Sequence, residues 1–176
     1  RGVRDFAFYD DALLLGAHRT LRPALSNLMD SDPGLRFHVP NALHVNQLSA
    51  SWCRLLYRAG FVEINLGVET TSRAKMKRWG DKVNREDVFR ALDNLSAAGF
   101  EPRRIGVYLL CGLPGQTPAE VSESIDLVVS AGATPRLCEY SPIPGTPHFE
   151  RIKRQALYDL EREPLFHNNT FFSMDE

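Results

Sequence analysis

An α/β fold with a parallel sheet is predicted by two features of the 176-residue sequence. Short apolar segments alternate five times with segments of helical periodicity, and repeated strand–helix units with right-handed crossovers form parallel sheets. In the segment IGVYLLCGLPGQTPAE, residues 105–120, an apolar run typical of a buried strand ends in a glycine turn and is followed by a helix start. Five units fit an open sheet or an incomplete barrel, and are too few for a closed barrel of eight strands.

The expected strands are short and apolar, and most end at a proline, a glycine or an acidic residue. They span residues 6–9, 35–39, 61–68, 104–111 and 136–140. Each is followed by a turn and then by a helix, so the order along the chain is strand, turn, helix throughout.

Capping residues and glycines predict where the helices begin and end. The expected helices span residues 17–29, 49–60, 72–79, 84–99 and 117–132, and a last helix reaches about residue 160. Pro23 must lie in the first turn of its helix or kink it. Thr117 and Glu120 are spaced as a capping box, with Pro118 at the first helical position.

Composition fits a globular domain, with 43% hydrophobic and 24% charged residues. A net charge of −1 argues against a nucleic-acid surface held by bulk charge. We see no transmembrane stretch and no signal peptide, so the cytoplasm is the expected location. Cys53, Cys111 and Cys138 form no CxxC pair and are expected as small buried hydrophobic residues, and no metal-ligand set is predicted.

Polar residues are expected to collect at one edge, because the carboxyl ends of parallel strands lie together. The residues expected there are Asp10, Asp11, Asn41, Glu69, the turn 111–115 and residues 139–141. Carboxylates beside open backbone would suit a ligand that carries an ammonium group and hydroxyls. Structural explanations stay open at this point, since Asp11 could cap the following turn and Glu69 could be a solvated strand end.

Four blocks of the chain resemble, in order and spacing, the radical S-adenosylmethionine (SAM) enzymes: FAFYDDALL, EINLGVETT, YLLCGLPGQTPAE and YSPIPGTPHF. The likeness is to the branch that often carries an N-terminal cobalamin-binding domain. The resemblance implies a partial barrel of six strands, of which residues 1–150 would form strands two to six, with residues 151–176 as a helix end and irregular tail.

The resemblance also implies a 4Fe–4S cluster, held by a CxxxCxxC loop, that cleaves SAM to a 5′-deoxyadenosyl radical. This sequence contains no CxxxCxxC motif. The resemblance therefore places the cluster ligands upstream of Arg1, implies that the segment is inactive by itself, and leaves cobalamin as a further cofactor of the parent protein.

Family contacts with SAM can be transferred where the motifs match. Asp10 and Asp11 stand where the family meets the SAM amino group, and Glu69 stands where a Glu or Gln contacts the ribose or a neighbouring basic residue. Lys82, one place after the usual family lysine, would reach the SAM carboxylate. The ribose and adenine positions fall on Tyr108, Leu110, Gly112, Tyr140 and Ser141. Tyr108 departs from the family, since some relatives have an aspartate there.

Two other functions stay open: a non-catalytic βα-repeat binding module, and a phosphate-binding barrel enzyme that uses the turn at Gly112. No lysine or arginine follows that turn closely, which disfavours phosphate. The sequence predicts neither the substrate nor the catalytic residues. If the first strand lacks a neighbour, residues 5–9 form an exposed aromatic edge that invites self-association.

Overall fold

Five parallel strands form the framework of the computed structural model, which describes residues 2–31, 34–78 and 83–162. One sheet pairs Asp5–Ala7 (β1) with Arg36–His38 (β2), and the other has the order Ile64–Glu69 (β3), Ile105–Cys111 (β4) and Thr134–Glu139 (β5). Within each sheet, every strand pairs with its neighbour in sequence, as expected for repeated strand–helix units. The predicted α/β class is confirmed, and the described strands form no closed barrel.

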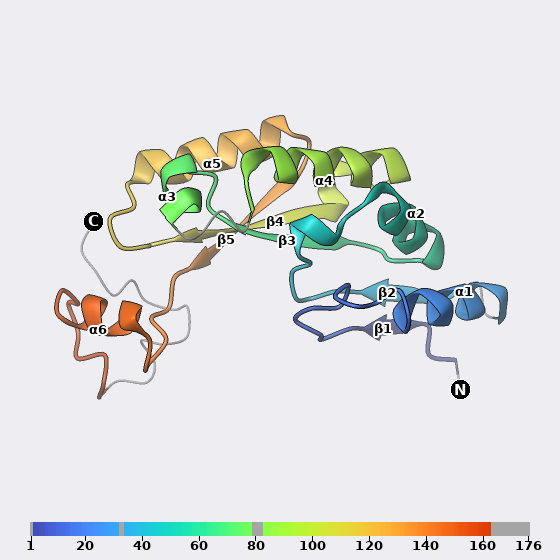
Figure 1. Ribbon diagram of the computed structural model, residues 1–176, viewed down its shortest axis with the longest axis horizontal. Helices are drawn as coiled ribbons and strands as arrows, with labels where there is room; N and C mark the ends of the chain where they lie inside the picture. The colour runs from blue at the N-terminus through green and yellow to red at the C-terminus, as the bar shows by residue number, and fades with distance from the viewer. Residues whose placement is uncertain (1, 32–33, 79–82, 163–176) are drawn as a thin grey trace.

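The two sheets are joined where the chain beyond β2 runs alongside β3. Isolated parallel bridges link Phe37 with Phe61 and Leu43 with Leu66. The Leu43 amide donates to the Asn65 carbonyl at 2.7 Å, and the buried Asn65 side chain donates to the Val39 carbonyl at 3.1 Å. The five strands therefore follow one another as in an incomplete barrel, with β1 and β2 at one side in Figure 1.

The helices are Leu21–Ser31 (α1), Ala50–Ala59 (α2), Arg73–Arg78 (α3), Arg85–Ala98 (α4), Pro118–Ser130 (α5) and Pro147–Lys153 (α6), with 3₁₀ turns at Val45–Gln47 (η1) and Pro102–Arg104 (η2). Figure 1 shows α3, α4 and α5 over one face of the β3–β4–β5 sheet. Ile105, Val107 and Leu109 are almost fully buried, as expected for the side chains on that covered face. Alternate residues such as Gly106 and Tyr108 point to the opposite face, which we call the inner face.

The predicted helix signals are confirmed at most ends. Asn84 and Thr117 both complete capping boxes, and Gly60 and Gly99 end α2 and α4 with φ of 95° and 110°. These left-handed angles favour glycine, which has no Cβ to clash. Ser49 accepts the Trp52 amide as the N-cap of α2.

The predictions for two other helices were wrong at one end. The first helix begins at Leu21 rather than near residue 17, because residues 11–20 form successive turns, with Gly16 at a φ of 68°. Pro23 therefore lies in the first helical turn. α6 ends at Lys153 rather than near residue 160. Leu160 folds back onto Phe149 and Ile152, which a straight helix rising about 1.5 Å per residue would keep more than 10 Å apart. The irregular tail expected at residues 166–176 lies outside the described part of the chain.

Candidate functional site

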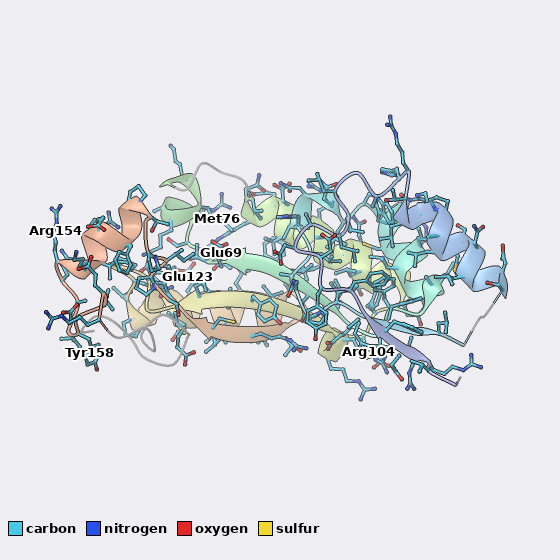
Figure 2. All side chains as sticks on the ribbon, turned by 90° about the horizontal axis from the view of Figure 1, so that it is seen from below. Glu69, Met76, Arg104, Glu123, Arg154 and Tyr158 are labelled. Carbon is cyan, nitrogen blue, oxygen red and sulfur yellow. The ribbon has the colours of Figure 1, made fainter. Side chains whose placement is uncertain are left out.

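Three neighbouring strands end at one edge, which we call the rim: residues 69–71, 111–116 and 139–141. The Tyr140 amide donates to the Cys111 carbonyl at 2.8 Å, and Glu69 pairs in register with Leu109. Figure 2 shows Arg104 near one end of the sheet and Glu69 towards the other. The rim therefore lies at the carboxyl ends of the strands, the position at which α/β proteins hold ligands.

Glu69 adopts a strained backbone conformation at the end of β3. Its φ is 67°, and no other non-glycine residue of the described chain has a positive φ. The Thr70 amide donates to the Val68 carbonyl at 2.8 Å and closes a γ-turn around Glu69. Such a conformation costs about 1–3 kcal/mol and persists only where the surroundings hold it. The Glu69 side chain is exposed, which leaves its carboxylate accessible to a ligand.

Buried polar contacts hold the residues that follow Glu69. Thr71 is fully buried, and its hydroxyl donates to the Ser124 hydroxyl on α5 at 2.9 Å. The Thr71 carbonyl accepts from Arg85 Nε at 2.6 Å, and the same guanidinium pairs with Glu123 at 2.6 Å. The turn at Glu69 is therefore fixed by contacts from α4 and α5.

The glycine turn after β4 is also braced by its own residues. Gly112 and Gly115 have φ of 80° and 70°. The Gln116 side chain donates to the Leu110 carbonyl at 2.9 Å and accepts from the Leu113 amide at 3.2 Å. These bonds occupy the Leu110 carbonyl and hold the turn in one conformation.

Glu120 closes the glycine turn at the start of α5. Its carboxylate accepts from the Thr117 amide at 2.9 Å and from Lys75 at 2.7 and 2.8 Å. The Lys75 ammonium, followed by the Thr117 amide, lowers the pKa of Glu120 below its usual value of about 4.5. A negative charge therefore already occupies the N-terminus of this helix.

The two aspartates after β1 have different surroundings. Asp10 accepts from the Ala12 amide at 2.7 Å, so the turn-capping role considered for Asp11 is filled by Asp10. Asp11 accepts from the Asn41 side-chain amide at 2.7 Å, and Asn41 also donates to the Tyr9 carbonyl at 3.2 Å. Asn41 thus holds the exposed Asp11 carboxylate in place from the end of the second strand.

Tyr108 lies on the inner face of β4. Its hydroxyl donates to the Pro40 carbonyl at 3.3 Å, immediately before Asn41. Tyr140 is half-buried against the small cluster of Phe149, Ile152 and Leu160, and this burial raises the pKa of its phenol. Ser141 is half-buried as well, and Lys82 lies outside the described residues.

The structure therefore brings Asp11 against Asn41 and places Glu69 and Gly112 on adjacent strand ends. Their convergence on one ligand stays a prediction. Reasoning from the sequence missed Lys75, Thr71 and Ser124. Ser124 carried a signal, because it is a polar residue at helical spacing from Val121 and Val128 on the apolar stripe of α5.

The three cysteines are free thiols on three different elements. Cys53 is buried, and this burial raises its pKa to about 11. Burial likewise raises the pKa of Cys111 and Cys138, which are only half-buried. Within residues 2–31, 34–78 and 83–162, His, Cys, Asp and Glu form no group of three that could hold a metal, and no helix is long and apolar enough to cross a membrane.

The chain is similar to solved structures of radical SAM proteins. TsrM from Kitasatospora setae, a radical SAM methyltransferase solved with tryptophan and a SAM analogue, aligns with a TM-score of 0.71 at 22% identity over 87% of this chain. HemN from Escherichia coli, a coproporphyrinogen III oxidase described as a radical SAM enzyme, aligns with a TM-score of 0.59 at 16% identity over 74%. The chain covers 30% of each of these proteins.

Sequence comparison also indicates the radical SAM proteins. The heme chaperone HemW of Bacillus subtilis is 32% identical over 88 residues, which is 50% of this chain and 23% of HemW. Residues 7–128 match the radical SAM superfamily, well over half of the sequence. The chain therefore belongs to the radical SAM superfamily.

Proposed function

We propose that this chain forms the SAM-binding wall of a barrel in a protein that cleaves SAM with a 4Fe–4S cluster. The observation that carries the proposal is Glu69, a strained and exposed carboxylate beside a braced glycine turn at the ends of the strands. Strain held at a ligand-binding edge indicates a functional position. The family match and the TsrM and HemN folds support the assignment.

The described residues fit an adenosyl amino acid. Asp11, held by Asn41, would accept charge-assisted hydrogen bonds from the SAM ammonium, and Glu69 would accept from the ribose hydroxyls. Gly112 would let the adenine approach the backbone, with Tyr108, Leu110, Tyr140 and Ser141 as the remaining adenosine contacts, Asp10 beside Asp11, and Lys82 for the carboxylate. When bound, SAM and the cluster would supply reductive cleavage of the sulfonium and the radical chemistry that follows.

The cluster itself does not fit the described residues. The three cysteines lie on α2, β4 and β5, and burial raises the pKa of each thiol. Iron ligands prefer thiolates. We therefore propose that the cluster is held elsewhere in the parent protein and that these 176 residues are inactive alone. TsrM with bound cobalamin supports cobalamin as a further cofactor of the parent.

The phosphate-binding alternative is disfavoured by Glu120. A phosphate at the glycine turn would need the N-terminus of α5, where the Glu120 carboxylate accepts from the Thr117 amide and from Lys75. A second anion there would meet like-charge repulsion. The substrate remains unassigned, and the proposed partners are a small-molecule substrate and SAM.

The test uses the intact protein, reconstituted anaerobically with iron and sulfide and then reduced with dithionite. We expect 5′-deoxyadenosine from SAM, measured by mass spectrometry. Asp11→Asn should weaken SAM binding by about 10–100-fold, because hydrogen bonds to charged groups contribute about 1.5–3 kcal/mol. Asp30→Asn, an exposed carboxylate on α1, is the matched control and should bind normally.

Two results would contradict the proposal. Intact protein that neither binds nor cleaves SAM would refute the SAM assignment. A stoichiometric cluster on the isolated 176-residue segment, measured as iron and acid-labile sulfide, would refute the claim that the ligands lie elsewhere.

A further inference from the structure

An ion pair joins the two rim turns across 45 residues of sequence. Lys75 lies on α3, directly after the Glu69 turn, and Glu120 lies in the first turn of α5, directly after the glycine turn. Their closest approach is 2.7 Å, and the two side chains are only 15% and 28% exposed. Lys75 Nζ also donates to the Gly115 carbonyl at 3.2 Å, so this one ammonium contacts both the helix start and the turn itself.

A second link lies one helical turn further along α5. Thr71 and Ser124 are both buried, and their hydroxyls are 2.9 Å apart. The Ser124 hydroxyl donates in turn to the Glu120 carbonyl at 2.9 Å. Glu120 and Ser124 therefore lie on one face of α5 that contacts both rim turns. The contacts with this face of α5 fix the Glu69 turn and the glycine turn relative to each other.

We propose that Lys75 and Glu120 are positioning residues, which hold the Glu69 carboxylate and the Gly112 backbone in the relative placement that an adenosyl ligand requires. The inference rests on the proposed function, and it adds residues that make no contact with the ligand. We refer to the contacts among Lys75, Gly115 and Glu120 as the clamp.

The energetics favour a positioning role for the clamp. The Glu69 turn carries strain of about 1–3 kcal/mol, which is released unless neighbouring contacts oppose it. α3 has only six residues, and isolated helices below about 12 residues are marginal in water, so it depends on its tertiary contacts. The clamp pair is far less exposed than the pair that Arg73, also on α3, forms with Glu86 of α4, whose side chains are 70% and 62% exposed.

Loss of the clamp should therefore release the Glu69 turn and the glycine turn together. Lys75→Met removes the ammonium and keeps a side chain of similar length. We expect the dissociation constant of an adenosyl ligand to rise about tenfold, the factor expected when the binding-competent arrangement falls to roughly a tenth of the population. Lys75→Arg keeps the charge and several donors, and should retain most of the affinity.

The experiment combines a binding measurement with amide exchange in the intact protein. S-adenosylhomocysteine, which carries no sulfonium to cleave, is titrated by calorimetry against wild type, Lys75→Met and Lys75→Arg. Hydrogen–deuterium exchange is followed in peptides that cover residues 69–72 and 112–116. Arg73→Met is the matched control, because it removes the exposed ion pair from the same helix.

The inference expects weaker binding and faster exchange in both peptides for Lys75→Met, recovery in Lys75→Arg, and neither change in Arg73→Met. If Lys75→Met does not fold, as judged by its circular dichroism, Glu120→Gln takes its place, and it should show the same two changes. Wild-type affinity and exchange in the clamp variant would overturn the inference alone. Wild-type protein that binds no adenosyl ligand would overturn the proposed function and this inference together.

Discussion

Substitution of Gly106 by alanine tests how tightly the side chains pack on the inner face of the β3–β4–β5 sheet. A Cβ at this position would clash with Asn65 Oδ1 and Arg136 Nε, because both atoms lie closer than real Cβ contacts allow. The missing side chain lets Arg136 of β5 lie across β4 and pair with Glu63, two strands away, at 3.1 Å. It also leaves room for Asn65, whose amide donates to the Val39 carbonyl and joins the two sheets.

The expected loss of stability follows from three contributions. Forcing a methyl group into a filled site costs about 1–3 kcal/mol. Displacing the Asn65 amide from Val39 leaves a buried group unpaired and costs about 1–3 kcal/mol more. The Arg136–Glu63 pair, with side chains 36% and 34% exposed, contributes only about 0.2–1 kcal/mol. Gly106→Ala should therefore lower the free energy of unfolding by about 2–7 kcal/mol.

Urea unfolding, followed by far-ultraviolet circular dichroism, measures this change. Gly67→Ala is the matched control, because Gly67 lies on the same face of the adjacent strand and its added Cβ would meet only Ala42 Cβ, at 3.4 Å. In a background of Arg136→Ala, the cost of Gly106→Ala should fall, since one of the two clashing side chains is gone. A loss below about 0.5 kcal/mol, or equal losses at Gly67 and Gly106, would refute the packing argument.

Three further predictions concern the rim and the first strand. Glu69→Gly should be more stable to urea than Glu69→Ala by about 1 kcal/mol, because glycine accepts a φ of 67° without strain. Both variants should lose affinity for SAM. Equal stabilities of the two variants would contradict backbone strain at Glu69. Since the pKa of Glu120 is lowered in the folded state, its contribution to stability is present above about pH 4.5 and is lost as the pH falls. The difference in unfolding free energy between wild type and Glu120→Gln should therefore shrink from pH 6 towards pH 3. A constant difference would count against a stabilising Lys75–Glu120 ion pair. Phe6 is 44% exposed on β1, so Phe6→Lys should reduce any concentration-dependent self-association in sedimentation, and an unchanged profile would exclude this edge.

Local signals predicted most of the fold. A helix N-cap such as Asn84 and a helix stop such as Gly99 act within a few residues, so their chemistry can be identified in the sequence itself. The continuous apolar run along β4 likewise needed no partner to be recognised as a buried strand. Where the prediction was wrong, as at the end of α6, the cause was a distant contact, because Leu160 packs back on Phe149.

The site depended on contacts that no local pattern reports. Asn41 reaches Asp11 across 30 residues, Thr71 reaches Ser124 across 53, and Tyr108 reaches Pro40 across 68. The type of each residue was visible in the sequence, but its partner was not. Family resemblance assigned residues at the strand ends, such as Glu69, and gave no role to the buried Thr71 and Ser124 that support them.

The separation of exposed rim residues from the buried residues that support them determines which positions of the chain can be substituted. A strained residue such as Glu69 is retained only while its neighbours oppose its relaxation, so the rim must carry supports that never meet the ligand. In this chain the supports at Thr71, Lys75 and Ser124 all converge on one face of α5, and not on the strands that bear the rim. Residues away from this face of α5 can therefore be substituted without disturbing the relative placement of Glu69 and Gly112.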